Sequence, residues 1–286
     1  MGLWTRLFGH AASPAPESAP ASRPATGAHA MPDAAMLPAP AVQLVVVDDG
    51  RTLSHFGGVP RLPTRVAWPE REGQRLDFLA RVSLTELQRA HPVDWLPTIG
   101  ALLFFFDMEG DRWGFDPSDR GSFAVLHVPD LPAPPLPLGE ESTLPHRAIA
   151  CRRIDVPPTM ERGHFEGIDV PDDESDRWFD MRDAVFEGHP KHQVSGCPSP
   201  VQGDDMELQC QLVTHGLYCG DASGYDDPRA ASLRAGAADW RLLLQMDTDD
   251  ALDLMWGDCG TLYFWVEGRK ARAGNFADAW VVMQCC

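Results

Sequence analysis

Eight residues in the second half of the chain have side chains that could act together in a polar pocket. They are His192, Gln202, Asp204, Gln245, Asp247, Asp249, Trp256 and Asp258, of which Gln245, Asp247 and Asp249 end or follow an apolar run. A histidine beside carboxylates can hold a water molecule or a metal ion and move its proton, so His192, Asp247 and Asp258 would suit a hydrolase. The same types of side chain also cap turns and fill cores, as Asp258 and Trp256 would do in a purely structural role.

The motifs that usually accompany catalysis are missing from the sequence. The chain has no G-x-S-x-G elbow, no glycine-rich phosphate loop and no H-E-x-x-H. Asp247 and Asp249 end an apolar run as in phosphoryl-transfer enzymes of the haloacid-dehalogenase type. That chemistry also needs a lysine and a later acidic pair, and Lys270 is the only lysine downstream. We therefore expect a binding domain rather than an enzyme, with the hydrolase as the alternative.

A second set of side chains could bind zinc. These histidines and cysteines fall within 31 residues, and they are His189, His192, Cys197, Cys210, His215 and Cys219. Tetrahedral zinc accepts such mixtures of nitrogen and sulfur ligands. Their spacing matches no zinc signature and the chain has no C-x-x-C, so buried thiols and hydrogen-bonded histidines are the simpler interpretation. We predict no cofactor, with zinc as the alternative.

The charge of the chain excludes several kinds of partner. There are 24 Lys and Arg against 42 Asp and Glu, a formal net charge of −18. This charge repels phosphate backbones and anionic lipid, so we expect neither a nucleic-acid nor a membrane partner. It favours a basic protein partner, such as a toxin neutralised by an immunity-type protein.

The cysteines and the start of the chain predict a cytoplasmic protein. Seven cysteines, an odd number, in a chain of this size indicate reduced thiols. The first residues hold no apolar stretch long enough for a signal peptide. The longest apolar run, 99–106, is far shorter than the roughly 20 residues of a membrane-spanning helix.

Composition divides the chain into a tail and one domain. Of the residues 11–41, 22 of 31 are Ala, Pro or Ser, which bury too little to fold, so residues 1–41 are predicted to be a disordered tail. A second proline cluster, 129–137, should be an exposed connection. The globular domain is predicted over 42–286.

The domain should be α+β, predominantly antiparallel β with few short helices. Apolar runs predict strands over 42–47, 101–106, 123–128, 241–246, 262–266 and 280–284. Ser83 and Glu86 have the spacing of a capping box that opens a short helix ending before Pro92. A second helix is expected over 175–187, with five apolar side chains near one face: Trp178, Phe179, Met181, Val185 and Phe186.

The sequence also contains a weak internal repeat. The segment 76–83 is followed by a glycine and an aromatic run, 100–105, and the segment 240–247 is followed in the same way by 260–265. We predict one domain built from two weakly similar halves, around 55–128 and 189–284. A cleft at their junction would be the first place to look for a ligand.

Several tracts resemble a known family. In the first half they are 57–63 (GGVPRLP), 68–69 (WP), 78–84 (FLARVSL) and 96–105 (LPTIGALLFF). In the second half they are 192–196 (HQVSG), 239–249 (DWRLLLQMDTD), 256–265 (WGDCGTLYFW) and 276–284. These tracts resemble the YwqG-like family (DUF1963), a bacterial domain of unknown function. The resemblance implies a mostly β, α+β fold with a repeated half and implies no activity. Arg81 departs from the glutamine that the family tends to carry there, which puts in doubt any role for a symmetric pair with Gln245.

Overall fold

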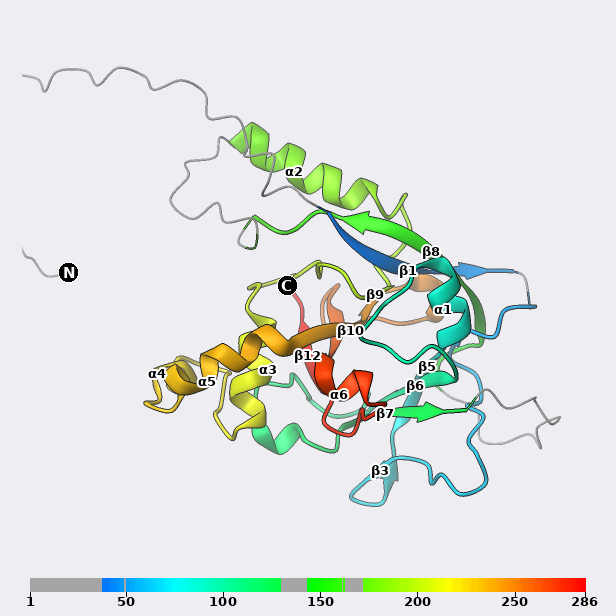
Figure 1. Cartoon of the computed structure of the whole chain (residues 1–286), viewed down its shortest axis with the longest axis horizontal. Helices are drawn as coiled ribbons and strands as arrows, with labels where there is room; N and C mark the ends of the chain where they lie inside the picture. Colours follow the sequence, from blue (N-terminus) through cyan, green and yellow to red (C-terminus); the bar gives the residue numbers. More distant parts are fainter. Residues whose placement is uncertain (1–37, 49, 130–142, 161, 163–171) are drawn as a thin grey trace, which may run out of the picture. The chain divides into compact units, whose positions relative to one another are not determined.

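Most strands of the chain join one antiparallel sheet in the computed structural model, which describes residues 38–48, 50–129, 143–160, 162 and 172–286 (Figure 1). Ten described strands join in the order β12-β11-β10-β9-β1-β8-β2-β5-β6-β7. Their bounds are β1 (Ala39–Val47), β2 (His55–Phe56), β5 (Asp77–Ser83), β6 (Ala101–Phe106), β7 (Phe123–Val128), β8 (Arg147–Val156), β9 (Gln193–Val194), β10 (Trp240–Asp247), β11 (Thr261–Glu267) and β12 (Trp280–Gln284). A separate hairpin joins β3 (Glu70–Arg71) to β4 (Gln74–Arg75).

The helices of the described chain are short. They are α1 (Leu84–Ala90), α2 (Asp172–Ala184), α3 (Met206–Thr214), α4 (Ser223–Asp226), α5 (Ala230–Leu233) and α6 (Gly268–Arg272), with 3-10 turns η2 (Pro117–Asp119), η3 (Arg234–Asp239) and η4 (Asp250–Leu252). The predicted fold class, predominantly antiparallel β with few short helices in one domain, is confirmed. The first strand begins at Ala39, inside the predicted tail, and most of the tail, like 130–137 of the proline cluster, lies outside the described residues.

The capping box at the start of α1 is only half formed. Ser83 Oγ accepts the Glu86 amide at 3.4 Å, as the spacing predicts. The Glu86 carboxylate instead accepts the Leu53 amide at 2.7 Å and the Ser54 amide at 2.9 Å. Glu86 therefore ties the helix start to the loop before β2.

The helix α2 begins three residues before its predicted start and ends at Ala184. Trp178 is buried, and its indole donates to the Pro158 carbonyl at 3.0 Å. Phe179 and Met181 are 58% and 40% exposed, and Val185 and Phe186 lie beyond the end of the helix, so the five apolar side chains predicted near one face do not form one buried face of α2.

The two groups of strands in the predicted repeat pair in the same way. Both β5–β6 and β10–β11 are antiparallel, and each contains one register shift, between Phe78 and Ala80 in the first pair and between Leu242 and Leu244 in the second. The shifts fall at the same place in the aligned segments. Each pair is then extended by a third strand, β7 or β12, at the edge of the sheet.

At the centre of the sheet, the strand that precedes each group in the chain pairs with the other group. The strand β1 pairs with β9 of the second group, and β8 pairs with β2 of the first group (Figure 1). The strands β1 and β8 also pair with each other, with Val45 opposite Ala150. Outward from this pair, the order is β9-β10-β11-β12 on one side and β2-β5-β6-β7 on the other. The pairing is thus symmetric about the centre of the sheet.

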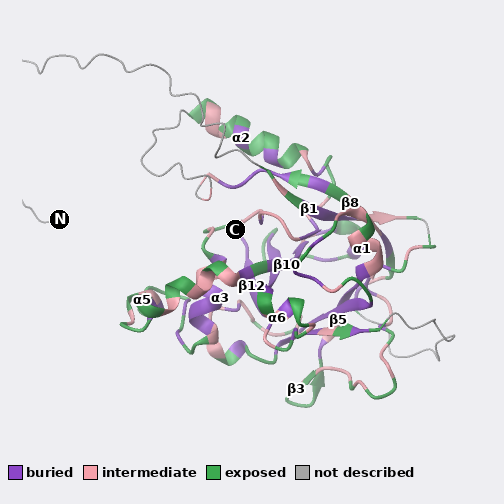
Figure 2. Ribbon diagram, in the orientation of Figure 1, coloured by how far each residue is buried: buried purple, intermediate pink, exposed green. Residues whose placement is uncertain are grey.

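The core lies where the two groups of strands face each other. Phe104 of β6 and Phe264 of β11, at matching positions, have ring centroids 5.2 Å apart in an edge-on arrangement. Figure 2 shows buried residues along the central strands and exposed residues over α2 and α5. The hydrophobic effect of this shared core is what holds the halves together.

Candidate functional site

Four of the predicted site residues meet between the start of β9 and the end of β10. The imidazole Nδ1 of His192 accepts the Asp247 amide at 3.0 Å, and Nε2 lies 3.1 Å from Asp249 Oδ2. Because Nδ1 accepts an amide proton, the ring proton lies on Nε2 and is donated to Asp249. His192 is 1% exposed and Asp249 is 6% exposed, so the pair is closed to solvent.

Asp249 is held in its charged form at this buried position. Burial by itself would raise the pKa of the Asp249 carboxyl, but the hydrogen bonds from His192 and from the Ala251 amide outweigh burial and lower that pKa below its ordinary value. The Ala251 bond, 2.8 Å long, caps the 3-10 turn η4. Both carboxylate oxygens are therefore engaged.

The other two members of this cluster bind backbone groups of the neighbouring loop. Asp247 accepts the Lys191 amide at 2.8 Å and the Thr261 hydroxyl at 2.9 Å. Gln245 donates to the Lys191 carbonyl at 2.6 Å and accepts the Ser199 amide at 2.8 Å. These side chains anchor the segment around β9, and the polar atoms of both are engaged by protein groups.

The first half of the sheet contains the same network built from other residues. Ser54 stands directly before β2 as His192 stands directly before β9. Its hydroxyl accepts the Ser83 amide at 2.9 Å and donates to Glu86 at 2.7 Å. In the aligned segments, Ser83 corresponds to Asp247, so the backbone bond is the same in both halves. A network present in both halves with different side chains is typical of a scaffold.

Arg81 and Gln245 also make matching bonds. Arg81 Nη1 donates to the Leu53 carbonyl at 3.0 Å, as Gln245 donates to the Lys191 carbonyl. Leu53 and Lys191 both stand two residues before the short strand of their half. Arg81 thus makes the same hydrogen bond to the backbone in the first half as Gln245 makes in the second.

The remaining four predicted residues do not join this cluster. Gln202 is exposed and donates to the Cys285 carbonyl at 2.8 Å, while Asp204 accepts Arg162 Nε at 2.6 Å. Trp256 is buried and packs edge-on against Phe106 at 5.6 Å.

Asp258 is the residue on which the hydrolase alternative depends. It is exposed in the turn before β11, and the structure gives its carboxylate no hydrogen bond with His192 or with Asp247. Its backbone carbonyl accepts the Cys286 amide at 3.3 Å. The three residues of the proposed hydrolase therefore do not form one site in the described part of the chain.

Sequence reasoning missed two residues, Tyr263 and Gln284, that bind the same loop segment as Gln245. Tyr263 donates its hydroxyl to the Ser199 carbonyl at 2.6 Å, and burial raises the pKa of that hydroxyl. Gln284 accepts the Val201 amide at 3.0 Å and donates to the Gly203 carbonyl at 2.9 Å. With Gln245, they bind the segment 199–203 across three strands. The signal that could have revealed each of them was a polar side chain within or at the end of an otherwise apolar strand.

The six soft ligands are not arranged around a metal ion. Among the described residues, no group of three or more His, Cys, Asp or Glu side chains is placed to hold one. Burial raises the pKa of the Cys210 thiol well above its ordinary range and that of Cys219 to about 11, which disfavours the thiolate that zinc needs. His215 Nδ1 lies 2.6 Å from the Gln211 carbonyl, so it is already engaged with the backbone.

None of the helices in the described ranges is long and apolar enough to span a bilayer.

Comparison with protein families gives one match. The model of the family described as "Domain of unknown function (DUF1963)" matches residues 54–285, which is most of the chain, so the chain belongs to this family. A search of curated proteins finds no match.

Proposed function

We propose that this DUF1963 protein, a cytoplasmic bacterial member of the YwqG-like family, works by binding a basic protein partner in the manner of an immunity-type protein and not by catalysis. One observation carries the non-catalytic part. The histidine and carboxylates that could do chemistry, His192, Asp247 and Asp249, bind the backbone, and Ser54, Ser83 and Glu86 make the matching network in the other half.

The arrangement of these residues speaks against the hydrolase alternative. A general base must reach the proton of a bound water or substrate, yet both nitrogens of His192 are engaged and its side chain is almost fully buried. Asp258, the third residue of that alternative, is exposed in a separate turn. We infer that the site residues stabilise the loops around β9.

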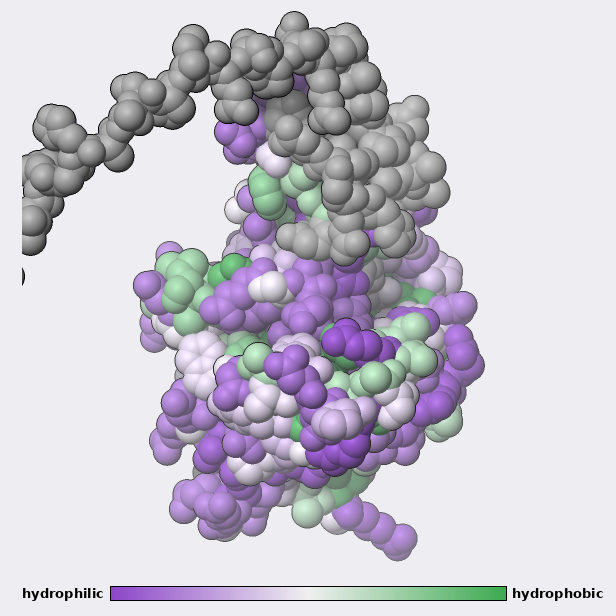
Figure 3. Space-filling model, turned by 90° about the vertical axis from the view of Figure 1, so that its left-hand side faces the viewer, coloured by the Kyte–Doolittle hydropathy of each residue, from purple (hydrophilic) through white to green (hydrophobic). Residues whose placement is uncertain are grey.

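The basic partner is supported by charge. A net charge of −18 creates a field that attracts cationic proteins over a distance of about one Debye length, roughly 8–10 Å at physiological salt. On the face drawn in Figure 3, hydrophilic side chains cover most of the described surface. Association with a basic partner would then be fast and would weaken with salt.

The helix α2 offers the surface that best suits such a partner. Its exposed acids are Asp172, Asp173, Asp176, Asp180 and Asp183. Phe179 and Met181 are exposed among them, so the helix combines apolar anchors with a ring of carboxylates. Of the two arginines in α2, Arg182 is buried and donates to the Pro198 carbonyl at 2.7 Å, which leaves Arg177 as its one exposed cation.

We also infer that the two halves arose by duplication of one unit. The matching register shifts, the symmetric strand order and the paired networks of Ser54 and His192 support this inference. The exchange of β1 and β8 between halves would then be a strand swap within one chain.

The test is co-purification at low ionic strength, with the bound proteins identified and quantified. We expect one basic protein at a stoichiometric ratio, released by salt. Binding should be lost in a Phe179→Ala variant that also carries Asp176→Asn and Asp180→Asn. The matched control carries Asp226→Asn and Asp253→Asn, which remove charges outside α2. Binding that is lost equally in both variants, or a partner that is not basic, would overturn the proposal.

The enzymatic alternative is tested separately with a broad screen of hydrolase substrates, with and without divalent metal ions. We expect no turnover above background. Metal-dependent turnover that Asp247→Asn abolishes in a folded protein would establish the alternative.

A further inference from the structure

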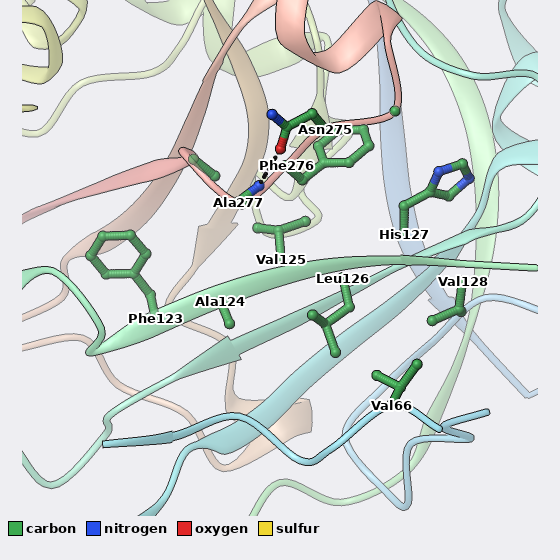
Figure 4. A pocket seen from close by; sticks show the side chains of 12 residues that line it. Val66, Phe123, Ala124, Val125, Leu126, His127, Val128, Asn275, Phe276 and Ala277 are labelled. Atoms are coloured by element: carbon green, nitrogen blue, oxygen red, sulfur yellow. Dashed lines mark hydrogen bonds between the residues drawn. The ribbon is translucent and has the colours of Figure 1, made fainter. Parts of the chain in front are cut away.

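A groove runs along β7, the edge strand of the first half (Figure 4). Its volume is about 380 Å³. Every residue of β7 lines it, together with Val66 on one side and residues 274–277 and Ala279 on the other. Figure 4 shows Val66 and Phe276 on opposite sides of the strand. The groove thus follows an open sheet edge.

The backbone of β7 has groups that point into this groove. The Asp107 amide donates to the Ser122 carbonyl at 2.8 Å, which makes these residues a hydrogen-bonded pair at the start of the β6–β7 ladder. Hydrogen-bonded and non-hydrogen-bonded pairs alternate along an antiparallel ladder. The amides and carbonyls of Phe123, Val125 and His127 therefore face away from β6. No described residue outside β6 forms a backbone hydrogen bond with them.

The matching edge in the second half is covered by main chain. In β12, the amide of Met283, which corresponds to His127, donates to the Trp113 carbonyl at 3.0 Å. Gly114 lies against Val281, where a Cβ atom would come within 1.9 Å of the Val281 carbonyl oxygen. A main-chain segment that contains a glycine is thus seated on one edge, and the equivalent place on β7 holds the groove.

Two exposed arginines lie close in the sequence to residues that line the groove. Arg65 adjoins Val66, and Arg272 lies two residues before Gly274; both are exposed and neither forms an ion pair with a described residue. Asp278 is the acid of the segment 274–279, and it is neutralised by Lys270 at 2.8 Å. The local charge therefore favours carboxylates.

We propose that the β7 edge binds an extended acidic peptide segment of a partner protein as an added strand. The outward amides and carbonyls of Val125 and His127 pair with the peptide backbone, as Met283 pairs with Trp113. Small apolar side chains of the peptide pack against the apolar lining of the groove, such as Val66 and Phe276, and its carboxylates are attracted by the charges of Arg65 and Arg272. At about 3.4 Å per residue, the six residues of β7 accept a peptide of roughly six residues. This surface is separate from α2, and its occupant has the opposite charge.

The direct test is amide hydrogen exchange by NMR with the probe peptide acetyl-Glu-Val-Asp-Val-Thr-Val-Glu-amide. We expect the peptide to slow exchange of the Val125 and His127 amides at least tenfold. Exchange at Ala124 and Leu126, whose amides already face β6, should stay unchanged and shows that the strand remains folded. A peptide with alternate N-methylated residues should not bind, because it lacks the donors of a strand.

Two protein variants test the charges of Arg65 and Arg272. Arg65→Glu with Arg272→Glu should raise the dissociation constant of the probe peptide at least tenfold. The control, Arg89→Glu with Arg234→Glu, makes the same charge change at exposed arginines elsewhere and should change it less than twofold.

Three results would overturn the proposal. The first is an absence of protection at Val125 and His127 with millimolar probe peptide. The second is equal binding of a peptide with Lys in place of its acids. The third is protection of these amides without peptide that grows with protein concentration, since a second copy would then be the occupant of the edge.

Discussion

His192 and Ser54 make the same backbone hydrogen bond in the two halves of the sheet. Each side chain accepts the amide at the end of the next long strand, Asp247 for His192 and Ser83 for Ser54. Each also binds a carboxylate at the following helical turn, Asp249 or Glu86. A histidine and a serine share no catalytic chemistry at such a site, so their common role is to hold the loop before the short strand.

The loss of stability on substitution of His192 should therefore depend on whether the new side chain can still accept a hydrogen bond from the Asp247 amide. We expect His192→Leu to lower the free energy of unfolding by about 2–3 kcal/mol, because the Asp247 amide and the buried Asp249 carboxylate lose their partner. His192→Asn keeps an acceptor of similar reach and should cost about half as much. Urea denaturation measures both. Equal losses would show that the shape of the side chain matters and its hydrogen bonds do not.

Replacement by Ala should destabilise the protein more at two glycines of the repeat than at a third glycine, which lies in a loop. A Cβ at Gly260 would lie 2.3 Å from the Gln284 carbonyl oxygen, and one at Gly100 would lie 2.5 Å from that of Val128. Because backbone atoms of a neighbouring strand have little room to move, either change to Ala should cost about 2–4 kcal/mol. Gly121 has a φ of +92° and open space, so Gly121→Ala should cost only about 1–2 kcal/mol. Thermal denaturation of the three variants tests this order.

His55 should make the stability depend on pH. Burial lowers the pKa of His55 from 6.5 to about 4, and the neighbouring His146, stacked at 4.7 Å, contributes to the shift. The unfolded chain therefore binds the proton more readily. The stability from this group is complete above pH 6.5 and is lost as the pH falls toward 4, by at most about 3 kcal/mol.

The substitution His55→Gln isolates this effect, because Gln193 occupies the matching position of β9. We expect the variant to lose less stability than the wild type between pH 7 and pH 4.5, as measured by urea midpoints. Parallel curves for the two proteins would contradict the assignment.

Strands with strong apolar patterns could be predicted from the sequence, and the central strand β8 could not. The strands over 101–106, 123–128 and 280–284 have the bounds expected from their aromatic and aliphatic runs. The strand β8 has three arginines among its ten residues, and Arg152 is accommodated by Gln43 of β1 at 2.7 Å. That partner lies 109 residues away in the chain, so no local pattern shows it.

The residues of the cluster around His192 could be predicted from their types, but the groups that their side chains bind could not. The sequence places Gln245 and Asp247 on one face of a strand, because side chains alternate in direction. It does not show that Lys191 supplies the backbone groups that both of them bind. The difference between a ligand site and an anchored loop depends on these contacts, which form only in the folded chain.

Zinc should be absent from the purified protein. We expect well under one zinc per chain when no chelator is used, and no change of the thermal midpoint with EDTA, because no group of three ligands is placed for a metal ion in the described residues. Elemental analysis gives the content. A stoichiometric content that falls when Cys210 and Cys219 are replaced by Ser would reverse this conclusion.

Arg81 offers the sharpest test of the symmetry between the halves. Its guanidinium donates to the Leu53 carbonyl, and Gln245 makes the matching bond to the Lys191 carbonyl with a shorter side chain. Because a glutamine reaches that carbonyl in the second half, Arg81→Gln should change the free energy of unfolding by less than about 1 kcal/mol. Arg81→Leu removes the donor and should cost about 1–3 kcal/mol, since it leaves a carbonyl without its partner. Urea denaturation of both variants decides between a hydrogen bond shared by the two halves and a role specific to the guanidinium. A large loss of unfolding free energy in both variants would mean that the charge of Arg81 acts on neighbours that a glutamine does not reach.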